Sequence, residues 1–159
     1  MVDQRTEPIV DVYLRAFQPT HDSVDHVFET LERLADRGRI AGYNVESWPS
    51  RATLTDEELP VVATFERFEN WADEKGVSIR PAFDVHRHQC GFTGDESEVL
   101  ITPSICLAVR DEDELQGVYP CSEDGTVCTV DDLLASLERG TGLPLHREAN
   151  SRAIQEVVQ

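Results

Sequence analysis

The amino-acid sequence predicts an α+β protein in which helices pack on one face of a mixed, mostly antiparallel sheet. Three stretches carry apolar residues at helical spacing, and several others alternate apolar and polar residues as strands do. Their order along the chain is β-α-β-α-β-β-β-α, which is typical of a two-layer sandwich. Of the 159 residues, 40% are hydrophobic, which is enough for one core. We therefore expect a single domain over residues 1–140 and a tail at 141–159 that is either docked or mobile.

Each element follows from the spacing of its apolar residues and from the residues that interrupt the run. Proline and glycine separate the runs and mark the turns between them. The predicted strands cover residues 9–17, 40–48, 77–92, 99–110 and 115–122, with a short stretch at 126–129. The predicted helices cover residues 20–38, 60–76 and 129–140. Two helices separated by a strand and followed by hairpins suggest a plan related to the ferredoxin-like fold, extended at one edge.

Capping residues indicate where the helices begin and end. The second helix should begin near Pro60, because proline lacks the donor that the second turn of an earlier helix would need. Thr129 is expected to cap the last helix. Gly38, Gly76 and Gly140 should end the three helices, since glycine readily adopts the left-handed conformation that follows a helix.

The charge of the chain indicates a habitat more than a partner. The sequence has 31 acidic and 14 basic residues, a net charge of -17, and Lys75 as its only lysine. Arginine in place of lysine and abundant surface carboxylates are typical of proteins from a salt-saturated cytoplasm. At about 1 M salt the Debye length is near 3 Å, so neighbouring carboxylates hardly repel one another. Charge alone therefore does not discriminate between partners, although an acidic surface otherwise repels nucleic acid.

The cysteines and the hydropathy pattern place the protein in a reducing cytoplasm. No export signal is visible and no apolar run approaches the roughly 20 residues that span a bilayer, so we expect no membrane association. Cys106 lies in a strand that is apolar on both faces and is expected in the core. Cys121 and Cys128 flank a turn at Asp124–Gly125, and a two-residue hairpin loop would place them opposite each other. Redox or metal use of this pair and simple packing are both open.

One strand carries the residues that come closest to a metal site. His86, His88 and Cys90 alternate in the predicted strand 77–92, so their side chains share one face. Two histidines at this spacing can converge on zinc or another transition metal, and Cys90 could join them if the strand bends. The alternative is a polar strand face whose histidines are solvated or pair with carboxylates.

Catalytic motifs are missing from the sequence. It has no nucleophile elbow, no phosphate-binding loop and no dinucleotide-binding fingerprint. Carboxylates are too numerous for any chosen pair to be informative. The sequence therefore favours a non-enzymatic protein with no catalytic residues and no cofactor.

A group of arginines is the candidate for nucleic-acid contact. Arg33, Arg37 and Arg39 cluster at the end of the first predicted helix, where cations also complement the helix dipole. A standard helix-turn-helix joins its helices by three or four residues, whereas some 20 residues separate the first two helices here. The sequence does not show a standard motif.

The chain resembles a family of short proteins of halophilic archaea that are described as containing a helix-turn-helix domain. The resemblance runs from about residue 9 to residue 138. It is carried by the segments IVDVYLRAF, ERLADRGRIAGYNVESW, FENWADEKGVSIRPAF, FTGDESEVLITPSICLAVRDEDELQGVYP and TVDDLLASLE. The resemblance implies a DNA-binding or regulatory role, with DNA as the partner.

Three functions remain open from the sequence. The first is a non-enzymatic cytoplasmic regulator that binds DNA, as the resemblance implies. The second is a small-molecule or metal sensor that uses the strand face of His86 and His88. The third is an assembly partner, in which an exposed edge strand or Trp48 and Trp71 form a homodimer.

Overall fold

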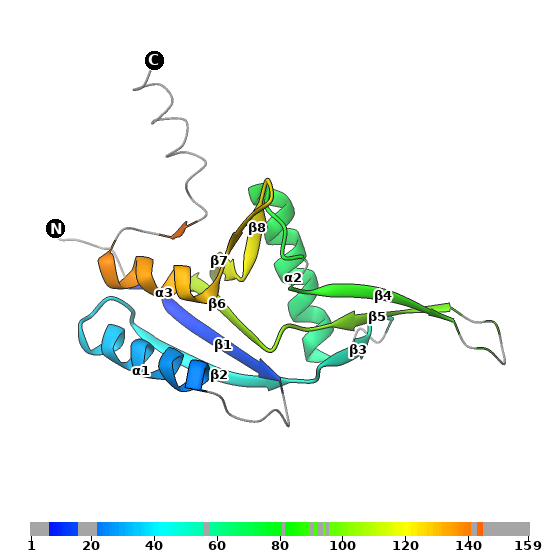
Figure 1. Cartoon of the computed structure of the whole chain (residues 1–159), viewed down its shortest axis with the longest axis horizontal. Coiled ribbons are helices and arrows are strands. Elements are labelled where there is room, and N and C mark those ends of the chain that lie inside the picture. The colour runs from blue at the N-terminus through cyan, green and yellow to red at the C-terminus, as the bar shows by residue number, and fades with distance from the viewer. Residues whose placement is uncertain are drawn as a thin grey trace, which may run out of the picture.

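The computed structural model describes residues 7–15, 22–55, 58–80, 82–89, 91, 94, 96–140 and 143–144. Twelve elements follow one another along these residues (Figure 1). They are β1 (Ile9–Arg15), α1 (Asp22–Asp36), β2 (Gly42–Trp48), β3 (Arg51–Thr53), α2 (Pro60–Lys75), β4 (Asp84–Gln89), β5 (Glu96–Ile101), β6 (Ile105–Asp111), β7 (Glu114–Tyr119), β8 (Cys121–Glu123), β9 (Thr126–Cys128) and α3 (Val130–Arg139). The predicted α+β class and mixed sheet are confirmed. The predicted tail at 141–159 lies outside the described residues except for 143 and 144.

The strands form three sheets, and the largest has the order β2-β1-β6-β7. β1 pairs in parallel with β2 and antiparallel with β6. Parallel neighbours need a crossover connection, which α1 supplies. This order departs from the expected ferredoxin-like plan, in which another strand would separate the two parallel strands. The remaining sheets are β3-β5-β4, which lies beside α2 and extends to the right in Figure 1, and β8-β9.

Helices cover both faces of the larger sheet, whereas the sequence indicated one. The ring of Phe28 on α1 lies 6.1 Å from the ring of Tyr43, which pairs with Val10 in β1. The ring of Phe68 on α2 lies 5.8 Å from that of Tyr13. Since side chains of a strand alternate between faces, Val10 and Tyr13 place α1 and α2 on opposite sides of β1. α3 lies beside α1 (Figure 1). The cause is that β1 is buried on both faces, since Val10 and Val12 on one face and Asp11 and Tyr13 on the other are all buried.

An aromatic cluster forms the core between α2 and the sheet. Tyr13 stacks on Trp48 at 4.8 Å, and Phe83 meets Trp48, Phe65 and Phe68 at 5.5, 5.8 and 6.0 Å between ring centroids. Offset and edge-on aromatic pairs of this kind add about 0.5–1.5 kcal/mol beyond their burial. Trp48 is therefore a core residue, and so is Trp71, which is 6% exposed. Neither tryptophan is the surface anchor that the assembly hypothesis considered.

The predicted strand at 99–110 is two strands that belong to different sheets. β5 ends at Ile101 and β6 begins at Ile105, and Pro103 between them has no N–H to donate to a ladder. The Thr102 hydroxyl donates to the Pro49 carbonyl at 2.8 Å, and Arg15 Nε donates to the Thr102 carbonyl at 2.9 Å. These bonds fix the corner at which the chain leaves one sheet and enters the next.

The other predicted strands also differ in length. Among the described residues of 77–92, β4 is the strand that forms, and Ser78 makes an isolated bridge to Ser122. The stretch 115–122 is divided between β7 and β8, where the Tyr119–Pro120 peptide bond is cis. β3 forms in a region that was expected to be loop. β3 pairs with β5, and Ser78 bridges to Ser122, so both depend on partners more than 40 residues away, which local periodicity cannot report.

The predicted ends of the second and third helices are confirmed, whereas the first, expected over 20–38, is α1 at Asp22–Asp36. α2 begins at Pro60 and is followed by Gly76 at φ 73°. Thr129 caps α3 in a capping box with Asp132, because each side chain bonds the backbone N–H of the other residue. Gly140, at φ 72°, ends α3.

Candidate functional site

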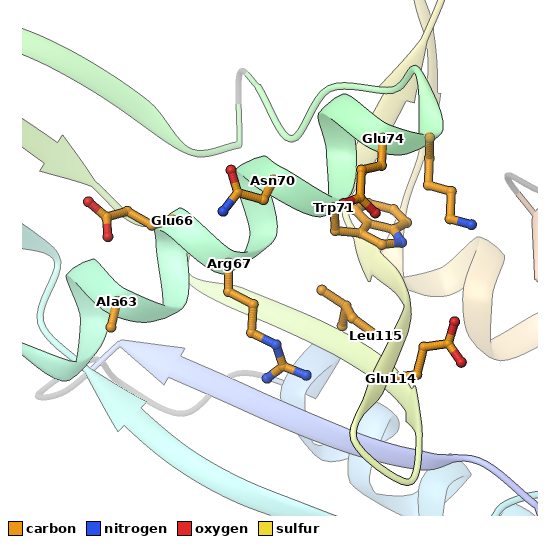
Figure 2. Close-up of a pocket in the computed structure, with 9 residues that line it drawn as sticks. Ala63, Glu66, Arg67, Asn70, Trp71, Glu74, Glu114 and Leu115 are labelled. Atoms are coloured by element: carbon orange, nitrogen blue, oxygen red, sulfur yellow. The ribbon is translucent and has the colours of Figure 1, made fainter.

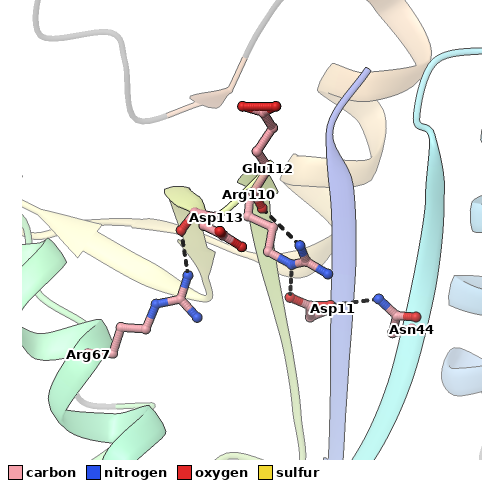
Figure 3. Close-up of polar contacts among 6 residues, drawn as sticks. All are labelled: Asp11, Asn44, Arg67, Arg110, Glu112 and Asp113. Atoms are coloured by element: carbon pink, nitrogen blue, oxygen red, sulfur yellow. Dashed lines mark hydrogen bonds and ion pairs between the residues drawn. The ribbon is translucent and has the colours of Figure 1, made fainter. Parts of the chain in front are cut away.

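A buried carboxylate joins three strands on the α2 face of the larger sheet. Asp11 of β1 is 7% exposed, and its Oδ2 accepts a hydrogen bond from Arg110 Nε of β6 at 2.8 Å. Its Oδ1 accepts from Asn44 Nδ2 of β2 at 3.1 Å (Figure 3). The hydrogen bond to Asp11 is the main cause that raises the pKa of Arg110, so the guanidinium stays charged. Burial raises the pKa of the neighbouring Tyr13 to about 12, with the charge of Asp11 adding to the effect.

The same arginine holds the β6–β7 turn. Arg110 also donates to the Glu112 carbonyl at 2.8 Å, and Glu112 has a φ of 58°, which few residues adopt. Arg67 of α2 donates to the Asp113 carbonyl at 3.2 Å (Figure 3). The turn is therefore tied both to the sheet and to α2.

A groove of about 480 Å³ lies between α2 and this turn, and we call it the α2 groove (Figure 2). From α2 it is lined by Arg67, Asn70, Trp71 and Lys75, and from β7 by Glu114 and Leu115. The indole nitrogen of Trp71 is buried, and within the described part of the chain it has no hydrogen-bond partner. Sequence reasoning missed this groove because its two walls are some 40 residues apart.

The histidine strand is placed as predicted, although its metal site stays a prediction. β4 contains both His86 and His88, which pair with Val99 and Ser97 of β5. His86 is exposed, and its Nε2 lies 3.1 Å from Asp84 Oδ2. The side chains of His88 and Cys90 lie outside the described residues. Among the side chains that are described, no three His, Cys, Asp or Glu residues gather closely enough to hold a metal ion.

The register of the cysteine hairpin is confirmed, since Cys121 pairs directly with Cys128. Both cysteines are buried, and no disulfide joins them in the structure. Burial raises the pKa of Cys121, as it does that of Cys106, which lies in the core as predicted. A buried thiol with a raised pKa is a poor nucleophile and a poor metal ligand. The pair therefore fits packing better than chemistry.

The three candidate arginines lie where α1 and α3 end together. Arg33 Nη2 donates to Glu138 Oε2 at 2.8 Å, and this hydrogen bond is the main cause that lowers the pKa of Glu138. The charge of Arg37 acts on Glu138 in the same direction. The Arg39 guanidinium occupies the space that a side chain at Gly140 would need.

A fourth arginine, Arg139, joins this group from the last turn of α3. The sequence could have identified Arg139, because it stands in the last turn of the predicted helix 129–140. We call Arg33, Arg37, Arg39 and Arg139 the arginine cluster. It holds four of the 14 basic residues of a strongly acidic chain.

Comparison with known proteins identifies a family. A family described as "Helix-turn-helix domain" matches residues 2–142 of this chain. The chain belongs to this helix-turn-helix domain family. No curated protein and no solved structure matched it. In the described part of this family member, no helix is long and apolar enough to cross a membrane.

This member of the helix-turn-helix domain family does not join its first two helices by a short turn. Residues 37–59, which include β2 and β3, separate α1 from α2, and the two helices lie on opposite faces of β1. The neighbouring helices are instead α1 and α3, which the Arg33–Glu138 ion pair links. A nucleic-acid contact made by α1 and α2 would therefore differ from the standard recognition-helix arrangement.

The buried carboxylate yields a stability prediction. We expect Asp11→Ala to lower the free energy of unfolding by about 2–3 kcal/mol, because it leaves Arg110 and Asn44 without their acceptor. Glu96→Gln is the control, since its ion pair with Arg87 is exposed and 3.8 Å long, and we expect a change within about 0.5 kcal/mol. Urea unfolding in molar KCl measures both. Equal losses of unfolding free energy for the two variants would show that the bonds of Asp11 to Arg110 and Asn44 do not stabilise the fold.

Proposed function

We propose that this chain is a non-enzymatic regulatory protein that contacts DNA in the cytoplasm of a halophile. The observation that carries this proposal is the match to a helix-turn-helix domain family over residues 2–142. The near absence of lysine supports the halophilic setting. The arginine content supports it as well.

We place the DNA contact at the arginine cluster. A guanidinium can donate two parallel hydrogen bonds to a phosphate, which a lysine cannot. Counterion release contributes little in molar salt, because affinity falls with about the 0.9Z power of salt concentration for Z phosphate contacts. Hydrogen bonds and DNA shape would then carry most of the affinity.

The cluster also has a structural explanation that an experiment must separate from DNA contact. Arg33 pairs with Glu138, and cations near the ends of α1 and α3 complement the helix dipoles. Arg37 and Arg39 follow the last residue of α1 and are exposed, so they are the members to vary.

Selection from a random duplex library in 1–2 M KCl tests this proposal. We expect an enriched sequence, and we expect the double variant Arg37→Gln/Arg39→Gln to bind it at least about tenfold more weakly. The slope of log K against log salt concentration should become shallower by about 1 for each phosphate that the variant no longer neutralises. The control variant Arg80→Gln/Arg87→Gln removes the same charge elsewhere and should bind normally. Failure to enrich a sequence, or equally weakened binding in both variants, would contradict DNA contact at this cluster.

The edge of the larger sheet supports a second proposal, that two copies pair through β2. β2 is an outer strand of its sheet, and Val45 within it is 50% exposed. Antiparallel pairing centred on Val45 would place Asn44 opposite the partner's Glu46, so the strand is complementary to itself. An open strand edge readily accepts such a partner.

Sedimentation velocity in 2 M KCl measures this association. The wild type should sediment as a dimer, and Val45→Arg should sediment as a monomer because a long cation blocks strand pairing. Val127→Arg is the matched control, since Val127, at 52%, is the other large exposed apolar residue in the described part of the chain. A wild-type monomer would exclude the β2 dimer.

A further inference from the structure

We propose that the α2 groove binds a small zwitterion with one carboxylate and one amine, of amino-acid or dipeptide size. Neither the DNA contact nor the β2 dimer uses this groove, so the inference goes beyond the proposed function and stands or fails separately. It rests on three observations, which are the size of the groove, an unsatisfied donor within it and the charges along its walls.

The size of the groove suits a small molecule. Its volume of about 480 Å³ falls within the roughly 300–1,000 Å³ of typical small-molecule sites. Figure 2 shows α2 as one wall and the strand that bears Glu114 and Leu115 as the other. The Arg67–Asp113 hydrogen bond and the contact of Arg110 with Glu112 hold these walls in place. The site is therefore largely formed before a ligand arrives.

The indole N–H of Trp71 is a hydrogen-bond donor that a ligand could satisfy. The Trp71 side chain is 6% exposed and lines the groove, and its Nε1 is buried without a partner among the described residues. Leaving a buried donor unsatisfied costs about 1–3 kcal/mol. The other tryptophan is satisfied, since Trp48 Nε1 donates to the Pro103 carbonyl at 3.3 Å. In Figure 2 the Trp71 indole lies between α2 and the strand that bears Leu115 and Glu114. Because this nitrogen has almost no accessible surface, the side chains that cover it must shift slightly to admit the carboxylate oxygen that accepts the missing hydrogen bond.

The charges on the walls of the groove favour a ligand that carries both a negative and a positive charge. Arg67 and Lys75 can pair with a carboxylate, and Lys75 is the only lysine of the chain. Three carboxylates can pair with an amine, namely Glu66, Glu74 and Glu114.

Ligands of a single sign fit less well. A phosphorylated ligand or another polyanion would meet three carboxylates against two cations. A simple cation would leave the Trp71 donor unsatisfied. The faces of Trp71 and Leu115 can cover a short aliphatic side chain, so the ligand also has an apolar part. At molar salt the Debye length is near 3 Å, so only direct contacts of this kind retain their strength.

The two indole N–H signals provide the test and its internal control. We would titrate the full-length ¹⁵N-labelled protein in 2 M KCl with the twenty free L-amino acids and with L-alanyl-L-alanine. At least one of these zwitterions should shift the Trp71 indole signal saturably below about 10 mM, while the Trp48 signal stays in place. Sodium acetate and ethylamine, which carry one charge each, should not shift the Trp71 signal over that range. The tryptophan signals are assigned with Trp71→Phe and Trp48→Phe.

Variants decide whether the groove residues make the contact. Lys75→Gln should weaken binding of the active zwitterion at least about tenfold, whereas Arg87→Gln removes an exposed cation on β4 and should leave binding unchanged. The proposal is overturned if no zwitterion moves the Trp71 signal up to 50 mM, if both indole signals move together, or if acetate alone is as effective. The DNA-binding test does not involve the α2 groove. A negative result there therefore leaves the zwitterion proposal unaffected.

Discussion

Burial of both faces of β1 is the constraint on which the rest of this structure depends. Val10 and Val12 are fully buried on one face, and Asp11 and Tyr13 are buried on the other. A strand of this kind needs a cover on each side and a neighbour on each edge. α1 and α3 supply one cover and α2 the other, while β2 and β6 supply the neighbours. The aromatic cluster, the Asp11 bonds and the α2 groove all lie on the α2 side as a consequence.

The same constraint reconciles the family with the geometry. A strand between α1 and α2 keeps them from forming the short-turn pair of a standard helix-turn-helix, although the chain belongs to a helix-turn-helix domain family. The helices that come together are α1 and α3, and their common end carries the arginine cluster. The two open surfaces that we infer, the arginine cluster and the α2 groove, lie on different helices. A regulator could thus contact DNA at one surface and a small ligand at the other.

The sequence predicted the features that depend on neighbouring residues, namely helix ends and the register of a short hairpin. Pro60, the Thr129 capping box and the Cys121–Cys128 register followed from spacing and residue type alone. What it missed depends on pairing between distant segments.

The break at Pro103 was visible as a proline inside an apolar run, but the change of sheet there depends on bonds from Thr102 to residues near 50. The helix layers were misassigned because alternation in 9–17 was taken as one buried face. Asp11 and Tyr13, which alternate with the apolar residues of that strand, are buried beside Arg110 and Phe68. The α2 groove needs two walls that only the fold brings together.

Nuclear Overhauser contacts among aromatic rings test the separation of α1 and α2 by β1 most directly. The predicted result is a contact between Tyr13 and Phe68 on one face, whose ring centroids are 5.8 Å apart, and a contact between Phe28 and Tyr43 on the other, at 6.1 Å. Direct contacts between Phe28 and Phe68, with none from Phe68 to Tyr13, would mean that α1 and α2 pack against each other, and would contradict the central place of β1.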